Sequence, residues 1–177
     1  MEPALALAVV ALAASVGIGL IFLTGGLSKL RHRILLPGVI ANYRLLPPSL
    51  VAPVAIALPF VEILTGGALL VGIAPVPVIV AILLLGIFAV AMGINIVRGR
   101  SHIDCGCGRS HLRHAIGWPL VGRNGALALL LAPRLLPAPA LLLGDRLTAM
   151  AGGLALYLAY LLFNSIGALI ASPTARR

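Results

Sequence analysis

Residues 4–27 read ALALAVVALAASVGIGLIFLTGGL, a run without a single charged side chain. A helix needs about 20 apolar residues to cross the hydrocarbon core of a bilayer, so this run is long enough to span a membrane. It has no basic residues ahead of it and exceeds the apolar core of a secretory signal. We therefore expect an uncleaved transmembrane helix here.

The composition of the whole chain agrees with this reading. Of the 177 residues, 61% are hydrophobic and 10% are charged, whereas a soluble domain carries about 25% charged residues. The net charge is +9, and the basic residues stand beside apolar runs without interleaved aromatic residues. This pattern excludes a water-soluble fold, argues against nucleic-acid binding and favours contact with anionic lipids. The four acidic residues are Glu2, Glu62, Asp104 and Asp145.

Four more apolar segments follow the first, and prolines separate several of them. Ala74-Pro75-Val76-Pro77 divides the second from the third, and the proline-rich residues 133–139 precede the last. The fourth is interrupted by Arg123 and Asn124, so it either crosses the membrane or is re-entrant. We predict one integral membrane domain over residues 1–177, an all-α polytopic transmembrane bundle of four to five spans. The expected spans are 4–27, 50–72, 78–97, 115–131 and 147–170, with a polar loop at 98–114.

The basic residues predict the orientation of the bundle. If the five segments cross in turn, ten basic residues fall on one side and two on the other. The positive-inside rule places the richer side in the cytoplasm. We expect the N-terminus outside, and the loop 98–114 and the C-terminus inside. The first set is Lys29, Arg31, Arg33, Arg44, Arg98, Arg100, Arg109, Arg113, Arg176 and Arg177; the second is Arg134 and Arg146.

Both cysteines of the chain lie in this loop, as Cys105-Gly106-Cys107. A disulfide across one residue needs unusual backbone angles, which Gly106 allows. So small a ring is strained, which makes its disulfide comparatively oxidising and easily exchanged. Nearby arginines favour the reactive thiolate, while Asp104 opposes it or could move a proton. The pattern indicates a redox-active dithiol; the plain alternative is two incidental loop cysteines.

A metal site is the alternative from another chemical class. Cysteine and histidine are ligands for Zn²⁺ and Cu(I), and several gather here. One residue between the thiols is, however, shorter than the usual spacing of a thiolate chelate. The histidines can equally be solvated residues at the membrane interface or proton partners of the thiols. The candidate ligands are His102, Cys105, Cys107 and His111, with His114 nearby.

A second polar constellation is expected inside the membrane. Glu62 is the only acid and Arg123 the only base within the predicted spans. Because an unpaired charge at membrane depth is costly, we predict that the two pair with each other and that Asn124 adds a hydrogen bond. The site is either a structural ion pair or a polar pocket that holds a quinone head group or conducts protons. Close helix packing is assigned to Gly66-Gly67, Gly86 and Gly152-Gly153, and interhelical hydrogen-bond donation to Asn95 and Asn164.

An ordered set of motifs over about residues 17–131 resembles the MauE/DoxX-like family. The motifs are Gly26-Leu27-Ser28-Lys29-Leu30, Tyr43-Arg44-Leu45-Leu46-Pro47, Pro59-Phe60-Val61-Glu62, Asn95-Ile96-Val97-Arg98-Gly99-Arg100, Asp104-Cys105-Gly106-Cys107-Gly108 and Arg123-Asn124. The resemblance implies a DoxX-like four-helix core and a multi-pass redox protein of the bacterial cytoplasmic membrane. MauE is associated with methylamine utilisation and acts with a thioredoxin-like partner, MauD, in maturing the disulfide-rich small subunit of methylamine dehydrogenase. One departure is Gly108, where the family usually has an aromatic residue.

Residues and resemblance together predict a thiol–disulfide oxidoreductase, or a component of one, that exchanges electrons with a thioredoxin-fold partner. Cys105 and Cys107 would be catalytic. A full transmembrane relay through this one pair would need either a mobile pair that is accessible from both faces or a second carrier such as a quinone. A metal-binding or transport protein and a noncatalytic DoxX-like subunit of a redox complex remain the alternatives. The supporting residues would be Asp104, Gly106, Glu62, Arg123 and Asn124.

Overall fold

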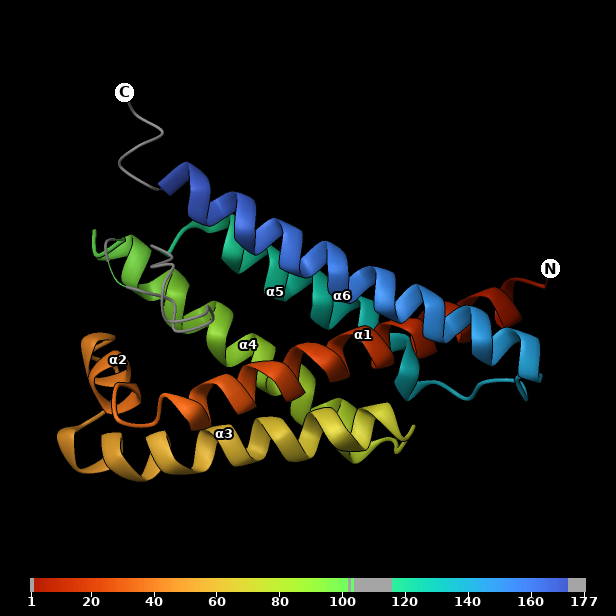
Figure 1. Ribbon diagram of the computed structural model, residues 1–177, viewed down its shortest axis with the longest axis horizontal. Helices are drawn as coiled ribbons and strands as arrows, with labels where there is room; N and C mark the ends of the chain where they lie inside the picture. Colours follow the sequence, from red (N-terminus) through yellow and green to blue (C-terminus); the bar gives the residue numbers. More distant parts are fainter. Residues whose placement is uncertain (1, 102, 104–115, 172–177) are drawn as a thin grey trace.

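The computed structural model describes residues 2–101, 103 and 116–171, with side chains up to residue 167. All regular structure in these residues is helical, which confirms the all-α prediction (Figure 1). The helices are α1 (Pro3–Arg31), α2 (Leu36–Asn42), α3 (Pro48–Leu70), α4 (Val76–Val97), α5 (Trp118–Leu131) and α6 (Leu143–Ala171), with a 3-10 turn, η1 (Ala132–Leu135), after α5.

Proline marks the start of most of these helices. It stands in the first turn of α1, α3, α4 and α5, where its missing N–H has no helical partner to lose. The far end of α1 differs from the prediction, because the helix continues past Leu27 to Arg31. This extra turn makes Lys29 a helical residue rather than a loop residue, with consequences for the site described below.

Helix α1 is the centre of the bundle. It packs most closely against α3 and α6, while α4 pairs with α5 (Figure 1). Glycines bring the helices together: a Cβ built on Gly66 of α3 would lie 2.7 Å from the Gly19 carbonyl oxygen of α1, and one on Gly153 of α6 would lie 2.7 Å from the Ala13 carbonyl oxygen. The predicted partners Gly67 and Gly86 have open space at the same position. The close contacts therefore use one glycine of the 66–67 pair.

The two ends of the bundle differ. Figure 1 shows the last turn of α1, helix α2, the end of α4, the start of α5 and the end of α6 together at one end, which we call the α2 end. The N-terminus, the α3–α4 turn and η1 lie at the opposite end. Because α5 leads from one end to the other, α1, α3, α4, α5 and α6 run in alternating directions (Figure 1).

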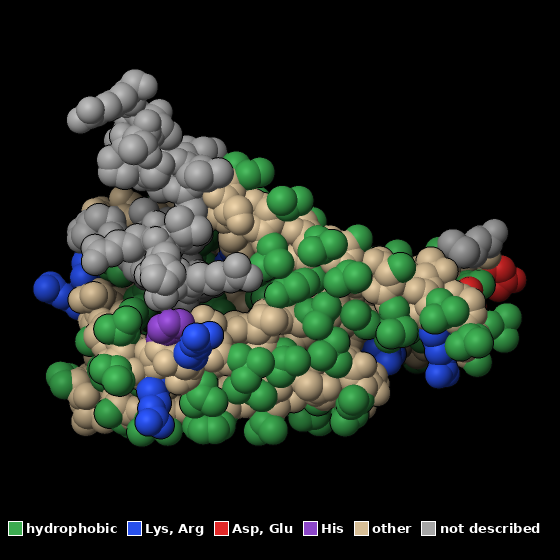
Figure 2. All heavy atoms as spheres, in the orientation of Figure 1, with side chains coloured by type: hydrophobic (Ala, Val, Ile, Leu, Met, Phe, Trp, Pro, Cys, Tyr) green, Lys and Arg blue, Asp and Glu red, His purple; other side chains and the backbone are tan. Residues whose placement is uncertain are grey.

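Four of the described helices, α1, α3, α4 and α6, are long and apolar enough to cross a membrane. Helix α5 has 14 residues and rises only about 21 Å, less than the hydrocarbon thickness of about 30 Å. Large apolar side chains point outward along the bundle, such as Leu64 (72% exposed) and Leu129 (76%), and Figure 2 shows them over its long side. Such a surface needs lipid around it, so the protein is a multi-pass membrane protein.

Candidate polar site and apolar pocket

An ion pair between Lys29 and Glu62 lies inside the bundle. Lys29 Nζ donates to both carboxylate oxygens of Glu62, at 2.9 Å and 2.8 Å. The Glu62 side chain is 2% exposed and that of Lys29 13%. A two-oxygen contact of this kind satisfies most of the carboxylate within the protein, as a charge at membrane depth requires.

Helix geometry brings Lys29 to this position. Ser15, Ile18, Phe22 and Gly26 follow one another at intervals of three or four and are all buried, and Lys29 continues the series by three residues. A Cβ built on Gly26 would lie 2.8 Å from the Pro59 carbonyl oxygen, so α1 and α3 are nearly in backbone contact beside the ion pair. The close approach places the lysine stem alongside Glu62.

The predicted pairing of Glu62 with Arg123 is therefore wrong in detail. Lys29 takes the carboxylate because its helix extends one turn beyond the expected end, and it packs against α3 more closely than α5 does. Lys29 is also one of the ten basic residues that were predicted on the cytoplasmic side, so that set loses one member. The remaining nine residues, ten less Lys29, still outnumber the two on the other side.

Arg123 is held by neutral partners. Its guanidinium donates to the Asn164 side-chain oxygen of α6 and, at 3.4 Å, to the Asn124 side-chain oxygen. The guanidinium carbon also lies 4.7 Å from the centre of the Tyr160 ring and 5.9 Å from that of Phe163. Amide oxygens and ring faces thus stabilise this cation where a carboxylate was expected. Asn164 is an interhelical acceptor, as α5 donates to it.

A small cavity lies between these two groups. It has a volume of about 40 Å³, and Lys29, Glu62, Arg123, Asn124 and Tyr160 contribute to its wall with apolar residues of α1, α4 and α5. One water molecule needs about 10–15 Å³ of such a volume. The cavity between Glu62 and Arg123 is therefore the size of a few waters.

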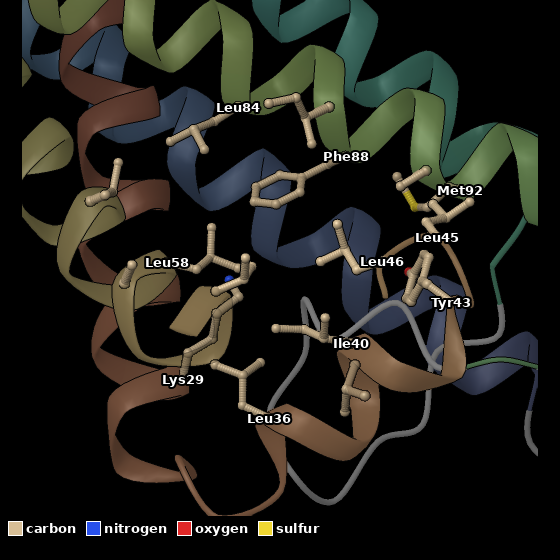
Figure 3. A pocket seen from close by; sticks show the side chains of 16 residues that line it. Lys29, Leu36, Ile40, Tyr43, Leu45, Leu46, Leu58, Leu84, Phe88 and Met92 are labelled. Carbon is tan, nitrogen blue, oxygen red and sulfur yellow. The ribbon is translucent and has the colours of Figure 1, made fainter. Parts of the chain in front are cut away.

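A larger apolar pocket of about 410 Å³ lies on the other side of Lys29, between α2, α3 and α4. Figure 3 shows Leu36 and Ile40 of α2, and Tyr43, Leu45 and Leu46 beyond it, facing Leu58 of α3 and Leu84, Phe88 and Met92 of α4. Among the described residues, Lys29 is the only charged one in its wall. The volume falls within the range of small-molecule pockets, about 300–1,000 Å³. This pocket therefore has room for an apolar ring or chain.

The chain on either side of the cysteine segment is anchored to the α2 end. The Ile116 N–H donates to the Ile103 carbonyl at 3.0 Å, and both isoleucine side chains are buried in a cluster with Met92. Just before them, Arg100 donates to the Asn95 side-chain oxygen at 3.1 Å and to the Asn42 carbonyl at 2.7 Å. Asn95 gives its own amide to Ala91 of the same helix, so it is not the interhelical donor that we predicted.

The predicted catalytic residues Cys105 and Cys107 and their supports Asp104 and Gly106 lie outside the described residues, as do the alternative metal ligands. Of the supporting residues, the structure brings Glu62, Arg123 and Asn124 to one cavity. Sequence reasoning missed Lys29 and Tyr160 as members of this site. The three- and four-residue spacing of buried positions along α1 was the signal that could have identified Lys29.

Comparison with known proteins gives consistent matches. The family model described as methylamine utilisation protein MauE matches residues 7–137. A methylamine utilization protein MauE from Paracoccus denitrificans is 40% identical over 164 residues, covering 90% of this chain and 88% of the relative. Its namesake from Paracoccus versutus is 33% identical over 84% of this chain and 82% of the relative. No solved structure matches the chain.

Proposed function

Because the chain belongs to the MauE family, we propose that it is a membrane thiol–disulfide oxidoreductase, or the membrane component of one. Cys105 and Cys107 are its redox pair, and its partner is a thioredoxin-fold protein. The relatives' name places them in methylamine utilisation. We extend to this chain a MauE-like role in the maturation of disulfide-containing proteins.

The exchange proceeds in two steps that balance electrons. The thiolate of one cysteine attacks a disulfide sulfur of the partner, forming a mixed disulfide and releasing a partner thiolate, which takes up a proton. The second cysteine loses its proton and attacks the sulfur of the first cysteine in the mixed disulfide. This attack releases the second partner thiolate. The partner is then reduced by two electrons and Cys105–Cys107 is oxidised; the reverse sequence transfers the electrons the other way.

The observation that carries this proposal is the anchoring of the cysteine segment. The hydrogen bond from Ile116 to Ile103 closes the chain on either side of residues 104–115, and Met92 packs against both. Cys105 and Cys107 follow Ile103 by two and four residues. A base held by a hydrogen bond and buried side chains supports repeated docking of a partner at one place.

The buried polar group supports the redox site from within the bundle. Lys29–Glu62 joins α1 to α3, and Arg123–Asn164 joins α5 to α6. The Arg123–Asn164 contact holds α5, to which the cysteine segment returns. Lys29 Nζ lies 5.7 Å from the centre of the Phe88 ring on α4, from which the segment starts. We propose that Glu62, Arg123 and Asn124 act on the dithiol by positioning these helices.

We propose that the bundle lies in the bacterial cytoplasmic membrane with its N-terminus outside. Arg31, Arg33, Arg44, Arg98 and Arg100 belong to segments at the α2 end, whereas Arg134 and Arg146 belong to the opposite end. By the positive-inside rule the α2 end faces the cytoplasm, and the N-terminus faces outward.

Trapping of the mixed disulfide tests the proposal. With Cys105→Ser or Cys107→Ser in the full-length protein, one attack can occur but resolution cannot, so a covalent complex with a thioredoxin-fold protein should accumulate in cells and disappear on reduction. The double serine variant is the matched control and should trap nothing. Full activity of Cys105→Ser in cells would favour the noncatalytic subunit, and stoichiometric metal retention that needs both cysteines would favour the metal-binding alternative.

A further inference from the structure

Two buried hydrogen-bond donors beside the small cavity lack acceptors. Arg123 Nε and Asn124 Nδ2 are shielded from solvent and have no hydrogen-bond partner among the described residues. Asn124 as a whole is 3% exposed. Leaving a buried donor unsatisfied costs about 1–3 kcal/mol, and more for a charged group, so proteins rarely do it without a reason.

The opposite wall of the same cavity offers acceptors. Arg123, Asn124, Lys29 and Glu62 all line this space of about 40 Å³. Each Glu62 oxygen accepts one N–H from Lys29, and an ionised carboxylate has about four acceptor sites. Residues with unpaired donors on α5 and a carboxylate with spare lone pairs on α3 therefore line the same cavity.

We propose that bound water fills this cavity and joins Glu62 to Arg123 and Asn124. A water oxygen accepts from Arg123 Nε or Asn124 Nδ2, and its hydrogens reach the Glu62 carboxylate directly or through a second water. At about 10–15 Å³ for each molecule, the cavity has room for two or three waters.

Water suits these walls better than an anion does. The walls carry two cations and one carboxylate, a net charge of +1, which by itself would attract chloride. Chloride, however, accepts hydrogen bonds and donates none, and it would lie against the negative oxygens of Glu62. Water satisfies both walls because it accepts on one side and donates on the other.

The bound water joins two polar groups into one hydrogen-bonded network. Lys29 and Glu62 join α1 to α3, whereas Arg123 and Asn164 join α5 to α6. Bridging water links the two halves through hydrogen bonds, so Glu62 and Arg123 are coupled without touching. This inference does not depend on the redox role of the cysteines.

Radiolytic hydroxyl-radical labelling of the full-length protein in lipid nanodiscs tests it. Radicals form from water at the site of irradiation, so a buried side chain is modified only beside bound water. Leu85 (3% exposed) and Leu127 (5%) line the cavity, whereas Leu69 and Leu131 (both 0%), which are also buried, do not. We expect at least fivefold faster modification of the first pair than of the second.

The variant Asn124→Leu removes one donor and fills part of the cavity. We expect labelling of Leu85 and Leu127 to fall to the level of Leu69 and Leu131. Equal, low labelling of all four leucines in the unmodified protein would overturn the proposal, whether or not the variant folds. A loss of thermal stability on replacing chloride with gluconate, together with unlabelled cavity leucines, would assign the site to an anion instead.

Discussion

Glu62 is a buried acid with a specific partner, and that choice of partner is a testable property of single residues. Removal of one member of a buried ion pair leaves an uncompensated charge, whereas removal of both replaces the pair with apolar packing. The structure pairs Glu62 with Lys29 at 2.8 Å, and Arg123 has neutral partners. The consequence is a hierarchy of couplings: strong between Glu62 and Lys29, weaker between Glu62 and Arg123.

The first prediction uses Glu62→Leu, Lys29→Met and their combination. Each single variant should lower the free energy of unfolding by about 3–5 kcal/mol, because it leaves one buried charge unpaired. The double variant should lose less than the sum of the two. Reversible unfolding in detergent micelles measures all four proteins. A matched cycle with Glu62→Leu and Arg123→Leu should give a smaller coupling; a larger one would restore the direct Glu62–Arg123 pair.

The second prediction concerns Arg123. Its planar guanidinium bonds Asn164 and Asn124 through separate nitrogens and stacks near Tyr160, and a lysine ammonium cannot reproduce this arrangement. Arg123→Lys should lower the free energy of unfolding by about 1–3 kcal/mol. The control Arg146→Lys, at an exposed position, should change it by less than about 0.5 kcal/mol. Equal effects in a thermal-stability assay would contradict the account of Arg123.

Residue chemistry explains how much of the site the sequence could predict. A lone acid in an apolar span must be buried and paired, and Glu62 is both. Its partner depended on whether α1 continued through Lys29, and a boundary uncertain by one turn decided between two cations. The sequence did not indicate that Asn164 and Tyr160 are the partners of Arg123, because they follow it by about forty residues on another helix.

At the scale of helices, the side of α3 on which a glycine lies determines how closely α1 and α3 approach. Composition indicated the Gly66-Gly67 pair as a packing site, but adjacent helical positions point about 100° apart. The structure turns Gly66 toward α1 and leaves Gly67 in open space. The four long helices were likewise recognisable from hydropathy. Helix α5 is shorter than its predicted segment because it begins at Trp118-Pro119, later than the apolar pattern suggested.

The third prediction compares Gly66→Ala with Gly67→Ala. A Cβ at residue 66 would lie 2.7 Å from the Gly19 carbonyl oxygen and from the Leu23 backbone nitrogen, neither of which can move cheaply. We expect Gly66→Ala to lower the free energy of unfolding by about 1–3 kcal/mol. Gly67→Ala should be neutral or stabilising by up to about 1 kcal/mol, because alanine favours helix. Indistinguishable unfolding curves for the two variants would place the α1–α3 contact elsewhere.

At the scale of the whole molecule, charge asymmetry predicts which end faces the cytoplasm. The fourth prediction tests it with single cysteines in the Cys105→Ser/Cys107→Ser background. Ile34 (88% exposed) lies in the α1–α2 turn and Val71 (75% exposed) in the α3–α4 turn. In intact cells, a membrane-impermeant maleimide should label Val71→Cys and spare Ile34→Cys. The opposite pattern would invert the orientation of the entire bundle.

Redox cycling of Cys105 and Cys107 is the central claim, and the most direct measurement is the state of these two thiols in living cells. A gel-shift assay compares a permeant maleimide with an impermeant one, before and after reduction. We expect the pair to be partly oxidised, to change state when the thioredoxin-fold partner is removed, and to react only with the permeant reagent. A pair that stays fully reduced under every redox condition would contradict the dithiol mechanism, and labelling by both reagents would contradict the cytoplasmic location.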